Sequence, residues 1–154
     1  MEFRRVVITG LGAVTPIGNT VPEYWDALCK GVNGAGHITR FDSTKFRTRI
    51  ACEVKGFDPQ QYFDRKEVRK LDLYTQFAIV ASDEAISDSG ITKDNTDFDN
   101  VGVVFSSGIG GINSFYEEVA AFCHRRWHSA LQSFHHSKAV TRFSRRTYLY
   151  KAWL

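Results

Sequence analysis

Twice in this sequence a short segment rich in β-branched residues runs into a glycine-containing turn and then into residues at helical spacing. The first segment is 5–9, followed by Gly-Leu-Gly, and the second is 101–105, followed by 106–111. Between them, the loosely alternating segment 49–55 predicts a further strand. With a helix expected after each strand, the order is β-α-β-α-β-α. This order predicts an α/β fold in which helices are layered on a mainly parallel sheet.

The expected helices have recognisable ends. For the first, Thr20 is a suitable N-cap, Pro22 fits the first turn and Gly31 can end the helix. The clearest helix is expected over residues 65–89, where apolar residues recur at helical spacing and Gly90 follows as a stop. A third helix is expected to begin at residue 112, because helical spacing resumes there.

Charge divides the chain near residue 123. The 154 residues have a formal net charge of +3, but residues 124–154 hold seven basic and no acidic side chains. Residues 1–123 contain the other 13 basic residues and all 17 acidic ones, so their net charge is −4. The tail also holds four of the five histidines and has neither Gly nor Pro. We therefore expect one domain, residues 1–123, joined to a non-native tail, residues 124–154.

Several classes of protein are disfavoured. No apolar run approaches the length needed to span a bilayer and no signal peptide is evident, so we expect a cytoplasmic protein without a membrane partner. We expect no nucleic-acid partner either. The three cysteines, Cys29, Cys52 and Cys123, are far apart and lack metal-ligand spacing, so they are interpreted as free thiols. Neither a metal site nor a cofactor is expected.

Both glycine turns have an alternative interpretation as nucleotide sites. Gly10-x-Gly12 after a strand suits a dinucleotide-binding turn, but Thr15 stands in place of the third glycine and Pro16 interrupts the helix start. A turn that needs positive φ explains these glycines better. Residues 106–111 lack the Lys-Ser/Thr of a phosphate loop and the spacing of a nucleophile elbow. They predict a strand-to-helix turn that closely approaches a ligand or a neighbouring subunit.

A basic cluster lies where the long helix is expected to begin, although a helix N-terminus favours acidic residues. Its members are Arg65, Lys66, Arg69 and Lys70. A solvated helix end is the simpler explanation of this cluster. The alternative is a binding site for an anionic partner that carries phosphate or acidic side chains.

Four segments carry a family resemblance when they are taken together and in order. They are 7–19 (Val-Ile-Thr-Gly-Leu-Gly-Ala-Val-Thr-Pro-Ile-Gly-Asn), 63–72 (Phe-Asp-Arg-Lys-Glu-Val-Arg-Lys-Leu-Asp), 88–90 (Asp-Ser-Gly) and 102–111 (Gly-Val-Val-Phe-Ser-Ser-Gly-Ile-Gly-Gly). They resemble the opening of the elongating β-ketoacyl-acyl carrier protein synthases, most closely the type II enzymes. The resemblance implies the incomplete N-terminal part of a thiolase-like layered fold. It also implies a homodimer that condenses acyl chains with malonyl carrier protein, with decarboxylation, in fatty-acid synthesis.

In that family a cysteine nucleophile accepts the acyl group and two histidines assist the decarboxylation. None of the three is matched here. Cys29, Cys52 and Cys123 lie outside the family's nucleophile motif, and His124, beside Cys123, lies in no matching context. No catalytic residue is therefore assigned.

Two features do carry over from the family. Lys66, Arg69 and Lys70 match the basic positions that meet the acidic acyl carrier protein, which favours the partner interpretation of the basic cluster. Ile109 matches the residue that gates the acyl pocket. The resemblance implies a role for the glycines beside Ile109, which are Gly108, Gly110 and Gly111. They would give this loop room to move and would allow close packing across the dimer.

The resemblance stops at the tail, where the family continues with a Gly-Pro-Arg turn and this chain has His-Arg-Arg-Trp-His-Ser. Permissible codons for the tail, read one base out of register, can encode Gly-Asp-Gly-Thr-Pro-Arg and, from Ser144, Ala-Ala-Gly-His-Ile-Ser. These are the family's missing segments. A frameshift is the economical explanation, and we expect an inactive fragment. Two other hypotheses stay open: a non-catalytic module that binds carrier protein or dimerises, and a dinucleotide-dependent reductase.

Overall fold

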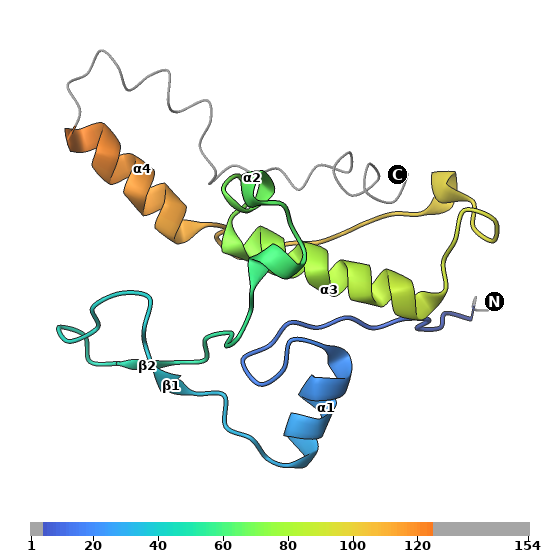
Figure 1. The fold of residues 1–154 in the computed structure, drawn as a ribbon, viewed down its shortest axis with the longest axis horizontal. Helices are drawn as coiled ribbons and strands as arrows, with labels where there is room; N and C mark the ends of the chain where they lie inside the picture. Colours follow the sequence, from blue (N-terminus) through green and yellow to red (C-terminus); the bar gives the residue numbers. More distant parts are fainter. Residues whose placement is uncertain (1–4, 125–154) are drawn as a thin grey trace. The chain divides into compact units, whose positions relative to one another are not determined.

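In the computed structural model, residues 5–124 are described, and the chain divides into two compact units (Figure 1). The described part of the first unit is 5–58 with 80–96, and that of the second is 59–79 with 97–124. The elements of the described part are α1 (Val21–Cys29), β1 (Gly36–His37), β2 (Ile50–Ala51), η1 (Pro59–Gln61), α2 (Arg65–Val68), α3 (Leu73–Ser89), η2 (Phe98–Asn100) and α4 (Ile112–His124).

The expected ends of the first helix are confirmed in α1. The Thr20 hydroxyl accepts a hydrogen bond from the backbone N–H of Glu23 at 3.4 Å, and Pro22 lies in the first turn. Gly31, two residues after the end of the helix, has φ of +66°, a conformation that glycine adopts without steric cost. Local capping chemistry therefore sets both ends of this helix.

The glycines of the first turn pack against the part of α3 that belongs to the same unit. A Cβ atom on Gly12 would lie 1.8 Å from the carbonyl oxygen of Ala81, and one on Gly10 would lie 2.2 Å from that of Ala85. Neither glycine has positive φ, so the expected positive-φ turn is wrong. These two positions lack a side chain because the backbone runs directly along the helix.

Two carboxylates of α3 hold this N-terminal segment by its backbone. Glu84 accepts hydrogen bonds from the N–H groups of Ala13 at 2.9 Å and Val21 at 2.8 Å, one at each carboxylate oxygen. Asp88 accepts one from the N–H of Leu11 at 3.0 Å. These charge-assisted bonds satisfy backbone donors that have no strand partner in the described part of the chain.

The expected strands at 5–9 and 101–105 are not strands in the structure. Both segments lie outside regular secondary structure, and Val6, Ile8 and Val104 are 90%, 82% and 96% exposed. A parallel strand is stable only beside partners that cover its backbone and both faces, and neither segment pairs with a strand within residues 5–124. The mainly parallel sheet is therefore absent from the described part.

The sheet that does form is small and antiparallel. β1 pairs with β2 in the register Gly36↔Ala51 and His37↔Ile50. β2 lies inside the expected strand 49–55 but is shorter, whereas β1 was not predicted, because its residues show no alternation.

The single long helix expected over residues 65–89 is interrupted at 69–72, where α2 ends before α3 begins. The Asp72 carbonyl accepts a hydrogen bond from the N–H of Gln76 at 3.0 Å, which starts a new helix. The expected stop is confirmed, since Gly90 has φ of +67° directly after α3.

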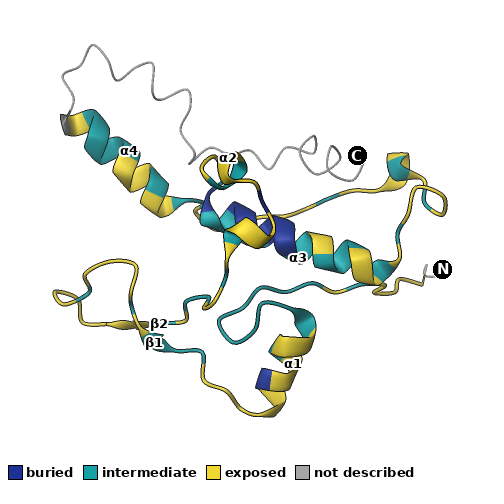
Figure 2. Ribbon diagram, viewed as in Figure 1, coloured by how far each residue is buried: buried dark blue, intermediate teal, exposed yellow. Residues whose placement is uncertain are grey.

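Burial in the second unit centres on the start of α3 (Figure 2). The buried apolar residues there are Phe63, Ala78 and Ile79, and three polar residues, Asp72, Thr75 and Gln76, are equally enclosed. In the first unit, the buried residues include Ala27 and Val80. Within residues 5–124 no helix is long and apolar enough to cross a membrane.

Candidate functional site

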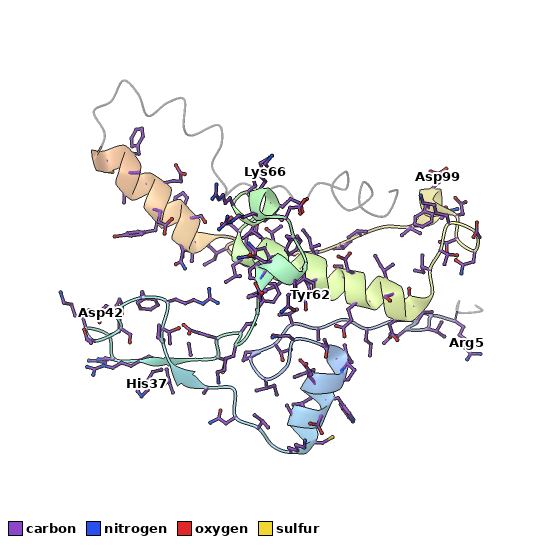
Figure 3. The ribbon with its side chains drawn as sticks, in the orientation of Figure 1. Arg5, His37, Asp42, Tyr62, Lys66 and Asp99 are labelled. Carbon is purple, nitrogen blue, oxygen red and sulfur yellow. The ribbon has the colours of Figure 1, made fainter. Side chains whose placement is uncertain are left out.

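The basic cluster lies on α2 and on the turn that leaves it. Arg65 and Lys66 belong to the helix, Arg69 is its C-cap, and Lys70 follows. All four side chains are exposed, and Lys66 projects away from the ribbon in Figure 3. Because α2 ends before α3, the cluster does not lie at the start of a long helix as expected. Arg69 and Lys70 instead lie at a helix C-terminus, where positive charge is favourable.

Residues 65–72, which carry the basic cluster and are called the basic turn below, are anchored by one buried amide. The side-chain N–H groups of Gln76 donate to the carbonyl oxygens of Leu71 at 2.9 Å and Val68 at 3.4 Å. Gln76 is only 4% exposed. The last carbonyl of α2 and one carbonyl in the turn after it are thus satisfied by a residue of α3, which fixes the direction in which the turn leaves the helix.

The loop 106–111 leads into α4. The Ser107 hydroxyl oxygen accepts a hydrogen bond from the N–H of Gly110 at 3.0 Å, and Gly110 has φ of +82°. Ile109 is 79% exposed. At Gly108 a Cβ atom would meet nothing within 4 Å among residues 5–124, so these residues give no steric reason for that glycine.

Asp72 joins this loop to the start of α3. Its carboxylate accepts a hydrogen bond from the hydroxyl of Ser114, in the first turn of α4. A Cβ atom on Gly111 would lie 2.3 Å from the other carboxylate oxygen, so Gly111 is required for the close approach of Asp72. The structure therefore brings together the end of the basic turn and the end of the loop that carries Ile109.

Sequence reasoning did not single out Asp72, Gln76 or Ser114. Asp72 lies within the family-like segment 63–72, and Asp is a favoured residue at a helix N-cap, but the helix expected over 65–89 runs through this position. Nothing local indicates that its side chain meets a residue 42 positions later.

The three cysteines are free, as expected, and all three are exposed. Cys29 lies at the end of α1, Cys52 follows β2, and Cys123 lies in the last turn of α4. Among residues 5–124 no group of three or more His, Cys, Asp or Glu residues is placed to hold a metal ion.

Comparison with known families assigns this chain to one of them. The family model described as "Beta-ketoacyl synthase, N-terminal domain" matches residues 3–144. The chain belongs to the β-ketoacyl synthase family. The match includes the basic turn, Asp72 and the Ile109 loop, and it continues past residue 123 into the basic tail.

Curated relatives match 73% of this chain. A protein from Synechocystis sp. named 3-oxoacyl-[acyl-carrier-protein] synthase 2 is 47% identical over 112 residues, which is 73% of this chain and 27% of the relative. The protein of the same name from Coxiella burnetii is 50% identical over the same lengths. The chain thus spans about a quarter of the length of the curated relatives that it matches.

Solved ketosynthase structures confirm the fold class, that of a partial thiolase-like α/β domain. The ishigamide ketosynthase/chain length factor matches 78% of this chain and 30% of its own, with a TM-score of 0.63 and 30% identity. A ketosynthase solved with a type II polyketide acyl-carrier protein matches 82% of this chain and 31% of its own, with a TM-score of 0.60. That second likeness is 23% in sequence identity and supports the fold alone.

Proposed function

We propose that this chain is the N-terminal portion of a 3-oxoacyl-[acyl-carrier-protein] synthase of fatty-acid elongation. The observation that carries the proposal is the 45–50% identity with synthases of that name from several bacteria. In the whole synthase, an acyl group held as a thioester would be joined to malonyl carrier protein with loss of carbon dioxide. The new carbon–carbon bond forms at the carbon that loses the carboxylate.

Within this portion, the basic turn is the proposed docking site for the acyl carrier protein. Lys66, Arg69 and Lys70 are exposed on a helix end that Gln76 holds in place. A fixed set of cations attracts an acidic partner and orients it at little entropic cost. The curated relatives are named as 3-oxoacyl-[acyl-carrier-protein] synthases, and this name supports the proposed partner.

Ile109 is the proposed gate of the acyl pocket in the whole synthase. Its exposed side chain lies on a loop beside Gly110, whose positive φ allows a sharp change in chain direction. The homodimer remains a prediction that rests on the family resemblance, and the cytoplasmic location likewise remains a prediction.

We further propose that these 154 residues do not catalyse condensation by themselves. None of the three cysteines lies in the sequence context of the family's nucleophile, and residues 124–154 are proposed to be a frameshifted, non-native tail. A module that binds the carrier protein without chemistry is the second candidate, favoured by the exposed basic turn. A stable monomer with salt-sensitive carrier binding would support it.

The docking proposal is tested by measuring the affinity of the 154-residue chain for acyl carrier protein at low and at physiological salt. We expect Lys66→Glu to weaken binding about tenfold at low salt and wild-type binding to fall as salt rises. Lys45→Glu is the matched control, because Lys45 is also exposed but lies outside the basic turn. Salt-insensitive binding, or equal losses in the two variants, would contradict the docking site.

A further inference from the structure

Asp72 is a buried carboxylate with one unused oxygen. The residue is 6% exposed, and one carboxylate oxygen accepts the hydrogen bond from Ser114. The other oxygen is buried and has no hydrogen-bond partner among the described residues. Leaving a buried polar atom without a hydrogen bond costs free energy. The contacts of Asp72 with its neighbours must therefore explain why the carboxylate is buried here.

On one side, Asp72 is continuous with the basic turn. Only Leu71 separates it from Lys70, and the Leu71 carbonyl is held by the Gln76 side chain at 2.9 Å. The Asp72 carbonyl in turn accepts the backbone N–H of Gln76 at 3.0 Å. Any movement of the turn relative to α3 must therefore break hydrogen bonds next to Asp72.

On the other side, Asp72 restrains the end of the Ile109 loop. Its free oxygen lies against Gly111, two residues after Ile109, and Ser114 lies in the first turn of α4. A negative charge near a helix N-terminus is favourable because the first N–H groups of the helix are unpaired. The carboxylate thus holds the loop at its helical end, while Ile109 itself stays exposed.

We infer that Asp72 is a positioning residue that ties the Ile109 loop to the basic turn, so that carrier protein bound at the turn changes the order of the loop. The inference rests on the proposed docking and gating roles of these two segments. The segments involved all lie within the second unit.

The proposed contact between Asp72 and the Ile109 loop is tested first without any partner, by hydrogen–deuterium exchange of the full 154-residue chain. Asp72→Asn keeps the shape and one acceptor oxygen but removes the charge and places a donor amide in the carboxylate's position. We expect amides of residues 108–114 to exchange about tenfold faster in this variant. Asp97→Asn is the control, because Asp97 lies in the same unit and its carboxylate accepts hydrogen bonds from Asp99 and Asn100 within η2. Unchanged exchange at 108–114 in Asp72→Asn would overturn the inference.

A pair of variants separates this role from a general loss of stability. Gly111→Ala places a methyl group 2.3 Å from the Asp72 oxygen and should speed exchange at 108–114. Adding Asp72→Ala removes the colliding atoms, so the double variant should exchange no faster there than Asp72→Ala alone. Independent, additive effects of the two substitutions would contradict direct contact.

The link to the turn is tested by adding acyl carrier protein. We expect carrier protein to alter exchange at 108–112 in the wild-type chain and to leave it unaltered in Asp72→Asn, with equal carrier affinity in both. The same response in both chains would overturn the inference. If the wild-type chain does not bind carrier protein, the proposed docking function fails, and the partner-free comparison still decides whether Asp72 holds the loop.

Discussion

Gly12 lies against Ala81 of α3 so closely that a Cβ atom on the glycine would be 1.8 Å from the alanine carbonyl oxygen. Gly10 makes the same approach one helical turn later, at Ala85. The N-terminal segment of the first unit is therefore fitted to the helix by its backbone, and Glu84 and Asp88 hold it there through backbone N–H groups.

We expect Gly12→Ala to push this segment off α3. The methyl group would meet backbone rather than a movable side chain, and overpacking of this kind costs about 1–3 kcal/mol. The measurement is amide protection of Ala13 and Val21, whose N–H groups are bonded to Glu84 only when the segment is seated. Gly36→Ala is the control, since a Cβ atom there would meet nothing within 4 Å in the described part of the chain. Equal protection in both variants would show that the segment is not seated on α3.

Acid should loosen the loop between β1 and β2. Glu53 accepts hydrogen bonds from the Thr39 hydroxyl at 2.6 Å and from its N–H at 3.2 Å, and Arg40 lies 4.0 Å away. Chiefly the hydroxyl bond holds the pKa of Glu53 below its ordinary value of 4.5. A lowered pKa in the folded chain means that the contribution to stability is present above pH 4.5 and is lost as the pH falls through the lowered pKa.

The test is the protection factor of the Thr39 amide by NMR between pH 6 and pH 3, each pH corrected for intrinsic exchange. Protection should fall with acid in the wild-type chain and be low and pH-independent in Glu53→Gln. Asp42→Asn is the matched control, because Asp42 bonds to Thr44 in the same loop and leaves Glu53 intact. A Glu53→Gln chain that keeps the wild-type acid response would disprove the assignment.

The parts of the fold that depend on residues close together in the sequence were predictable from the sequence. Thr20 and Gly31 set the ends of α1, and Gly90 follows α3, because caps act within a few residues. The strands at 5–9 and 101–105 were not realised, since a parallel strand takes its stability from partners distant in sequence.

The candidate site shows the same limit. The basic residues and Ile109 were identified by their match to a family pattern, but the hydrogen bond that joins Asp72 to Ser114 spans 42 positions. Gly111 was expected to serve loop movement and dimer packing, whereas within this chain its lack of a side chain makes room for Asp72. Only the tertiary arrangement reveals that reason.

The chain on its own should be aggregation-prone or molten. Val6, Ile8 and Val104 are almost fully exposed on segments that have the composition of buried strands. Unpaired strand backbone and uncovered apolar side chains favour association. We expect binding of a hydrophobic dye and a broad thermal transition. A monomer with one cooperative transition would contradict this and strengthen the carrier-binding module as the better hypothesis.

The purified chain should show no condensing activity. The reaction needs a thiolate to hold the acyl group while a carbanion forms beside it, and proximity to histidine donors lowers the barrier. Cys29, Cys52 and Cys123 are exposed, and we expect none of them to act as the nucleophile, because none matches the nucleophile motif that the family resemblance implies. The assay is formation of β-ketoacyl product from malonyl and acyl carrier proteins. Product that disappears in Cys123→Ala would refute both the inactivity and the dismissal of that cysteine.

The frameshift proposal makes the last prediction, at the level of the gene. If residues 124–154 are read one base out of register, deleting one base or inserting two near codon 124 restores the family's reading frame. The protein so encoded should continue from α4 into a Gly-Thr-Pro-Arg turn and later contain Ala-Gly-His-Ile-Ser. The acidic residues missing from the tail, which has seven basic and no acidic side chains, should then reappear. DNA that encodes neither segment in the shifted frame would rule out the frameshift and would leave the basic tail as a native part of the chain.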